Sequence, residues 1–206
     1  MPSDRQFGFS LIELLLASSL GLVVLMAVIQ ALLGEQRLGQ ELGELLHQRQ
    51  QLQRANDLIA ADLRRGLTLA ADPLASHHQS ACSLARRHPV LHVDGPDGRS
   101  TTYSVGSAPS PIWRGWVLMR CGQAFGSDGG INPGSKAQNR VVLDGLDPAP
   151  RPWDGCALPN ATPIAASQAL PLAACMERST GLVQWQLRLR LGPRQQEGGG
   201  SALMKG

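Results

Sequence analysis

The first third of the chain carries one long apolar pattern. Residues 9–33 are almost entirely apolar, and between Leu14 and Ile29 there is no charge and no strongly polar residue except two serines. About 20 residues at a rise of about 1.5 Å each cross the roughly 30 Å hydrocarbon core of a bilayer. The segment is longer than the core of an ordinary signal peptide, and no small-x-small cleavage site follows it. It therefore predicts a transmembrane helix.

The helical pattern continues in amphipathic form over residues 34–66. No proline interrupts residues 9–72, and Arg64, Arg65 and Gly66 are typical of a helix C-terminus, where cations face the negative end and glycine takes the left-handed cap. Apolar residues recur at helical spacing, which indicates a stripe that faces a partner: Leu38, Leu42, Leu45, Leu52, Ala55, Ile59 and Leu63. One helix from about Ser10 to Arg65 is expected.

Residues 67–196 show the shorter patterns of strands. Pro89 to Asp94 and Ser100 to Val105 flank a Gly-Pro-Asp-Gly turn and predict a hairpin. Residues 112–120 and 140–143 are further strand candidates, and Leu182 to Leu191 alternates strictly between apolar and polar positions. Residues 122–136 and 144–171 are rich in Gly and Pro and predict loops. The Gly triplet in 197–206 predicts a flexible tail.

These patterns predict an α+β fold. A long N-terminal helix, transmembrane in its first half, packs on a small antiparallel sheet of about four or five strands. The inward row of residues 182–191 is expected to face the leucine stripe of the helix.

Composition narrows the function classes. Aromatic residues make up 4% of the 206 residues, which leaves little for a catalytic cleft or a stacking platform. The net charge of +3 divides into five Arg against six acidic residues over 9–66, and thirteen Lys/Arg against nine acidic residues over 67–206. Since the basic residues are dispersed, the charge favours a solvated surface and not nucleic acid as a partner.

The four cysteines, Cys82, Cys121, Cys156 and Cys175, all follow the apolar segment. An even number confined to the turn-rich part suits two disulfides in an oxidising compartment, which places residues 67–196 outside the cytoplasm. Three pairings are possible. Proximity in the sequence favours Cys156 with Cys175, which leaves Cys82 with Cys121.

The string Gly8-Phe9-Ser10-Leu11-Ile12-Glu13-Leu14 resembles the class III prepilin signal of type IV pilins and type II secretion pseudopilins. The resemblance implies a leader of residues 1–8, cleavage between Gly8 and Phe9 by a prepilin peptidase, and N-methylation of Phe9. Glu13 matches the glutamate at the fifth mature position. A carboxylate near the start of a membrane helix is costly, and in a filament it can pair with the new amine of a neighbouring Phe9.

The stretch from Asn56 to Arg65 resembles the helix end of PilW-like minor pilins and of J-type minor pseudopilins. This resemblance favours a non-enzymatic minor pilin that helps to initiate or cap a type IV pilus. Its implied partners are the major pilin, other minor pilins, the inner-membrane assembly platform and membrane lipid. The implied location is the inner membrane with a periplasmic domain, then a pilus or pseudopilus. A type II secretion minor pseudopilin is the alternative, and a DNA- or surface-binding tip protein is a third reading.

Candidate chemistry elsewhere is weak. A metal-like group fits no standard zinc spacing and is interpreted as surface loop histidines: His77, His78, Cys82, His88 and His92. Asp94, Asp97 and Asp128-Gly129-Gly130 with Asn132 lie in Gly-rich turns but lack a calcium-loop spacing. No nucleophile elbow, zinc-protease motif or phosphate-binding loop is present. No metal, no cofactor and no catalytic residue is therefore assigned.

Overall fold

The structure is a computed structural model that describes residues 10–76, 79–126, 130–132, 134–156, 158–165, 169–191 and 194–205. It divides into two compact units, Met1–Gln50 and Gln51–Gly206. The predicted leader, Gly8 and Phe9 lie outside the described residues.

One helix, α1 (Leu11–Arg65, 55 residues), accounts for the long helical pattern, so the predicted helix is confirmed. In the first unit, the 22 residues Leu11–Leu32 are long and apolar enough to cross a membrane, and none of that stretch is buried. Leu42 and Leu45 are also exposed. Such an apolar surface requires lipid or other helices to cover it.

In the second unit, the last turns of α1 carry the buried part of the leucine stripe. Leu52, Ala55, Ile59 and Leu63 are all 7% exposed or less and belong to the hydrophobic core. The i, i+3, i+4 spacing places these four side chains on one face. The helix ends at Arg65, and the Gly66 N–H donates to the Leu63 carbonyl at 3.1 Å.

In the described part of the second unit, the sheet has nine antiparallel strands, more than the four or five predicted. Their order is β1-β2-β3-β4-β5-β8-β7-β6, with β9 on the other side of β8. A 3-10 turn, η1 (Pro73–Ala75), follows β1. The strands are β1 (Thr68–Ala70), β2 (His88–Asp94), β3 (Ser100–Ser107), β4 (Trp116–Gly122), β5 (Gln138–Leu146), β6 (Thr162–Pro163), β7 (Leu172–Glu177), β8 (Leu182–Leu191) and β9 (Arg194–Leu203).

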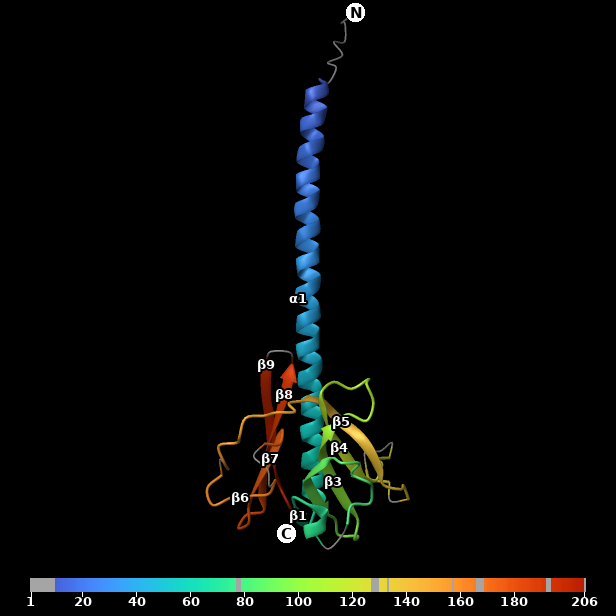
Figure 1. Ribbon diagram of the computed structural model, residues 1–206, viewed down its shortest axis with the longest axis vertical. Coiled ribbons are helices and arrows are strands. Elements are labelled where there is room, and N and C mark those ends of the chain that lie inside the picture. The colour runs from blue at the N-terminus through green and yellow to red at the C-terminus, as the bar shows by residue number, and fades with distance from the viewer. Residues whose placement is uncertain are drawn as a thin grey trace, which may run out of the picture. The chain divides into compact units, whose positions relative to one another are not determined.

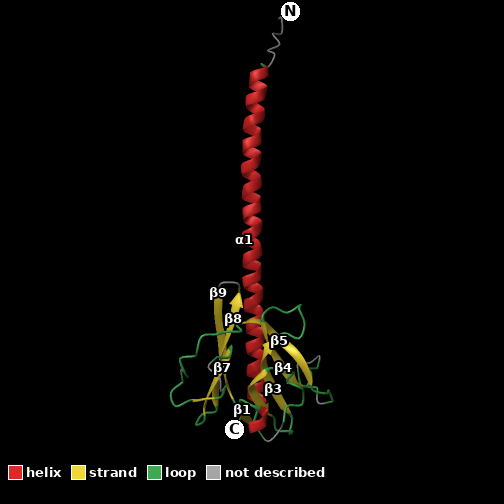
Figure 2. Ribbon diagram, viewed as in Figure 1, coloured by secondary structure: helices red, strands yellow, loops and turns green. Residues whose placement is uncertain are grey.

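The sheet curls around the end of the helix. Figure 1 shows the last turns of α1 with β3, β4 and β5 on one side and β7, β8 and β9 on the other. Side chains from both groups of strands enter one core with Ile59 and Leu63 of the helix. Helix and strands occupy separate parts of the chain (Figure 2), which gives the α+β class predicted from the sequence.

The clearest sequence patterns became the expected strands. The predicted hairpin is β2–β3, and the alternating stretch is β8. Val183, Trp185, Leu187 and Leu189 on one face of β8 are 2% exposed or less, whereas Gln186 on the other face is exposed. The period of two therefore identified the core face correctly.

The prediction of a flexible tail at 197–206 was wrong, because residues 197–203 belong to β9 and pair with residues 182–188 of β8. The glycines are needed for close approach. A Cβ added to Gly198 would lie 2.2 Å from Leu52 Cδ2 of α1, and one added to Gly200 would lie 2.6 Å from the Trp185 ring. The Gly triplet thus lets β9 pass close to the helix and the tryptophan.

Candidate functional site

The N-terminus of α1 is capped by the side chains of Ser10 and Glu13. The Ser10 hydroxyl accepts a hydrogen bond from the Ile12 N–H at 3.3 Å, and Glu13 Oε2 accepts one from the Ser10 N–H at 3.2 Å. This Ser-x-x-Glu arrangement is a capping box, which satisfies N–H groups that have no partner within the helix. The acidic side chain also lies at the positive end of the helix dipole.

Glu13 is exposed, and its second carboxylate oxygen accepts no hydrogen bond from the residues that the structure describes. Gly8 and Phe9 lie outside those residues. Cleavage, methylation and the pairing of Glu13 with an amine therefore stay predictions. What the geometry provides is a carboxylate held at the helix start with one oxygen available for a further donor.

The four cysteines form two disulfides in the second unit. Cys82 pairs with Cys121 over 39 residues, and Cys156 pairs with Cys175 over 19 residues. This is the pairing that sequence proximity favours. In the chain-entropy model, loops of these lengths stabilise the fold by about 3 to 4 kcal/mol each. The first disulfide ties the segment before β2 to β4, and the second ties a long loop to β7.

A buried ionic cluster joins the end of α1 to the sheet. Asp62, which is 3% exposed, accepts hydrogen bonds from the Tyr103 hydroxyl at 2.6 Å, from Arg120 Nε at 2.7 Å and from Arg120 Nη2 at 3.1 Å. Arg120 Nη1 also donates to the Gln123 carbonyl at 2.8 Å, and its guanidinium lies 4.8 Å from the Phe125 ring centre. The bidentate geometry compensates both buried charges.

The buried cluster raises the pKa values of Tyr103 and Arg120, the two residues that donate hydrogen bonds to Asp62. Burial, followed by the charge and hydrogen bond of Asp62, raises the pKa of the Tyr103 phenol well above its usual range. Burial by itself would lower the pKa of Arg120, but the hydrogen bonds and charge of Asp62 outweigh it and raise that pKa. Tyr103 is therefore a neutral donor and Arg120 a permanent cation, which marks a structural ion pair and not an acid–base pair.

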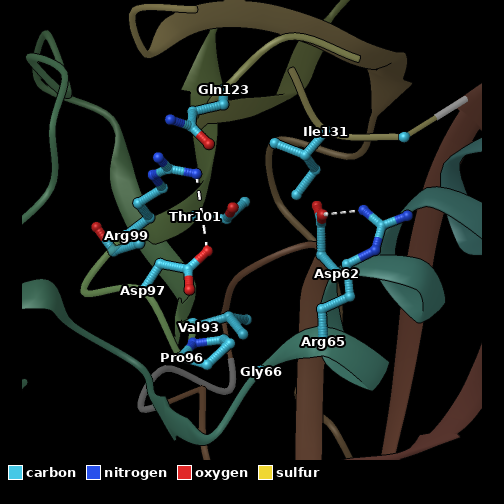
Figure 3. Close-up of a pocket in the computed structure, with 13 residues that line it drawn as sticks. Asp62, Arg65, Gly66, Val93, Pro96, Asp97, Arg99, Thr101, Gln123 and Ile131 are labelled. Atoms are coloured by element: carbon cyan, nitrogen blue, oxygen red, sulfur yellow. Dashed lines mark ion pairs between the residues drawn. The ribbon is translucent and has the colours of Figure 1, made fainter. Parts of the chain in front are cut away.

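A cavity of about 410 Å³ lies beside this cluster, between the end of α1 and the turn of the β2–β3 hairpin. Figure 3 shows Asp62 and Arg65 on one wall and Asp97 and Arg99 on the facing wall. The two arginines are paired with these carboxylates at 3.9 and 3.7 Å. Among the described residues, its remaining polar lining consists of Ser100, Thr101 and Gln123, with no histidine, cysteine or lysine.

The histidines were interpreted as residues of a surface loop, but His92 lies in a strand and is buried. His92 is fully buried in β2, with Nδ1 2.8 Å from Thr102 Oγ1 and Nε2 3.1 Å from Asp94 Oδ1. His88 is exposed at the start of β2 and stacks on Trp116 with ring centres 6.3 Å apart. The surface expectation was therefore wrong for His92, because β2 turns its side chain into the molecule.

Four of the other metal candidates lie outside the described residues: His77, His78, Asp128 and Gly129. The remaining candidates are dispersed. Cys82 is consumed by a disulfide, and Asp94 Oδ2 accepts from the Thr68 and Ser76 hydroxyls. Among the described residues, no group of three or more His, Cys, Asp or Glu side chains is placed to hold a metal ion.

Sequence reasoning missed the Asp62 cluster. A signal existed, because Asp62 follows Ile59 by three residues and therefore lies on the buried stripe of the helix. An acidic residue on such a stripe needs a partner. Its partners Tyr103 and Arg120 lie 41 and 58 residues away, so no local pattern could identify them.

Comparison with known proteins bears on the N-terminus. The family described as "Prokaryotic N-terminal methylation motif" matches residues 3–29. The match includes Gly8, Phe9, Glu13 and most of the apolar stretch of α1, and it ends before the second unit. No curated protein and no solved structure matches the chain.

Proposed function

We propose that this chain, a type IV pilin-like protein by its N-terminal methylation motif and apolar helix, is a minor pilin that helps to initiate or cap type IV pilus assembly. As a prepilin-like protein it is processed by a peptidase, assembles with other pilins and is part of a pilus or pseudopilus. The single observation that carries the proposal is the coincidence of the matched motif, over residues 3–29, with an exposed apolar helix, Leu11–Leu32. This points to a structural subunit and not to an enzyme.

The minor role is supported by the second unit. A major pilin is expected to have its cysteine pair near the C-terminus, whereas here Cys175 is followed by β8 and β9. The two disulfides suit an oxidising compartment, so the second unit is proposed to lie in the periplasm before assembly. The helix end from Asn56 to Arg65 resembles that of PilW-like minor pilins and of J-type minor pseudopilins, so it supports a minor subunit of either filament.

In the proposed mechanism, cleavage between Gly8 and Phe9 creates a positive amine close to the start of α1. Glu13 already accepts the Ser10 N–H through one oxygen, and the other oxygen would receive the amine of a neighbouring Phe9. The pairing would offset the cost of placing both charges in the apolar core of a filament. The apolar surface of Leu11–Leu32 would be covered by lipid first and by neighbouring helices after assembly.

The charge of Glu13 can be separated from its capping role. Glu13→Gln keeps an acceptor for the Ser10 N–H but loses the charge. We expect Glu13→Gln and Glu13→Val to insert into the membrane normally and to enter purified filaments at about a tenth of the wild-type level or less, since a lost buried ion pair costs several kcal/mol. Quantitative immunoblotting of membranes and filaments measures both. Normal incorporation of Glu13→Gln would contradict the pairing.

Mass spectrometry of the extracted protein should find a chain that begins at methylated Phe9. An intact Met1 in cells with an active prepilin peptidase would overturn the proposal. Deleting the gene should abolish surface pili and leave exoprotein secretion unchanged. The reverse result, normal pili with lost secretion, would favour a minor pseudopilin of a type II secretion system, which the same motif supports.

A further inference from the structure

The sheet is split between β5 and β8. β5 pairs with β4 along its whole length, from Gln138 to Leu146, but it meets β8 only through Leu146 and Leu189. In the described part of the chain, residues 138–144 therefore have no strand on their second side. The β4–β5 register shifts twice, and Gly145 has a φ of 71°. Such bulges bend and twist a strand, which explains why β5 turns away from β8.

A cleft of about 230 Å³ is lined by α1, by β5, and by Arg120 of β4 with residues 123–125 that follow it. Its apolar lining includes Leu58 of the helix, Phe125, and Val141 and Val142 of β5. Three consecutive β5 residues, 140–142, line it. Since consecutive side chains of a strand point to opposite faces, a cleft that touches all three follows the edge of the strand, where the backbone N–H and C=O groups are accessible.

The charged residues that line the cleft in the described part of the chain are all arginines. Arg54 of the helix and Arg140 of β5 both line it and are both exposed, and no acidic residue lines it within the described residues. Arg140 donates to the amide oxygen of Gln138 at 3.1 Å, and neither arginine has a carboxylate partner among the described residues. Arg120, the third lining arginine, is neutralised by Asp62. The cleft thus presents two uncompensated cations beside an apolar floor.

We propose that this cleft binds an extended acidic segment of a partner protein, which adds to the open edge of β5 as a further strand. Backbone hydrogen bonds to residues 138–144 would hold the segment, as in other cases of strand addition. One apolar side chain would enter the space between Leu58 and Val141, and carboxylates on either side would meet Arg54 and Arg140. The cavity is smaller than usual small-molecule sites, which favours a side chain as its occupant. The inference is independent of the proposed function, because every group lies within residues 51–206.

The test uses the full processed chain in detergent micelles and a fluorescent peptide, Thr-Val-Glu-Val-Glu-Val-Thr. Fluorescence anisotropy compares it with the same peptide carrying Lys in place of Glu, and with a version whose alternate backbone nitrogens are methylated. We expect the acidic peptide to bind at least about tenfold more tightly than either analogue, since one removes charge complementarity and the other the strand hydrogen bonds.

Two charge reversals locate the site. Arg54→Glu and Arg140→Glu should each weaken binding of the acidic peptide by about tenfold, whereas Arg178→Glu, an exposed arginine outside the cleft, should leave it unchanged. Circular dichroism checks that the variants stay folded. Binding that tolerates backbone methylation would overturn strand addition and indicate simple anion attraction. The proposal would also be refuted if all three reversals had equal effects, or if no peptide binding were seen at millimolar concentration. Concentration-dependent dimerisation that is lost in Arg140→Glu would refute it as well, because the edge of β5 would then bind a second copy of this chain.

Discussion

Removal of the Asp62 carboxylate should be the most damaging single change in the ionic cluster. Asp62→Ala leaves the guanidinium of Arg120, which is 4% exposed, without a countercharge, and leaves the fully buried Tyr103 hydroxyl without an acceptor. Breaking a buried ion pair costs about 3–5 kcal/mol, and an unsatisfied buried donor about 1–3 kcal/mol. Because both belong to one network, the costs do not add fully. We expect a loss of about 3–5 kcal/mol in the free energy of unfolding.

The assay is urea unfolding of the full chain in detergent micelles, followed by tryptophan fluorescence. Trp185 is a suitable reporter because its Nε1 donates to Asn56 Oδ1 of α1 at 2.8 Å, so it senses separation of helix and sheet. The matched control is Asp57→Ala on the same helix. Asp57 is exposed, and its loss should change the free energy by no more than about 0.5 kcal/mol.

The double variant Asp62→Leu/Arg120→Met separates charge from packing. Replacing a buried ion pair by apolar residues of similar size is often neutral or stabilising, so the double variant should be more stable than Asp62→Ala by at least about 2 kcal/mol. A loss below about 1 kcal/mol for Asp62→Ala, or a double variant as unstable as the single one, would refute the reasoning. Either result would mean that water reaches the cluster and screens it.

Two further predictions concern Tyr103 and β9. The pKa of Tyr103 is raised in the folded state, so the stability it contributes is present below about pH 10 and is lost as the pH rises beyond the pKa of the unfolded chain. Tyr103→Phe should abolish this decline, and since the chain has one tyrosine, phenolate absorbance reports the titration directly; ionisation near pH 10 in the folded protein would contradict it. Gly198→Ala should cost about 1–3 kcal/mol in urea unfolding, because its Cβ would lie 2.2 Å from Leu52 Cδ2. Gly134→Ala is the control, because among the described residues its Cβ would meet an Asn132 oxygen at 3.5 Å, an ordinary contact. Equal losses for the two variants would argue against close packing of β9.

Local patterns predicted the elements that depend on neighbours in the chain. The boundaries of α1 followed from apolar periodicity and from Arg64, Arg65 and Gly66, and the β2–β3 hairpin followed from its Gly-Pro-Asp-Gly turn. The strands that were missed lack such local signals. β7 (Leu172–Glu177) is short, and β9 reads as a flexible tail because of its glycines. Both exist because β8 offers them backbone hydrogen bonds on its two sides.

The candidate sites also differ in whether local sequence could predict them. The prepilin-type motif and Glu13 are contiguous in the chain, so sequence spacing sufficed to find them. The Asp62 cluster and the cleft beside β5 join residues from the helix and from distant strands, and single-sequence spacing carries no record of such pairs. The burial of His92 likewise depends on which way β2 faces.

By itself, the sequence determined that the chain carries a prepilin-type methylation motif and an apolar helix, because residue spacing and hydrophobicity are properties of a local segment. Only the tertiary structure decided what the rest of the molecule offers to a partner. Of the stripe residues whose burial is described, Leu42 and Leu45 are exposed and those from Leu52 onward are buried. The C-terminal glycines let β9 pass close to the helix, and β5 diverges from β8 beside two exposed arginines. Those outcomes depend on how closely distant backbones approach one another.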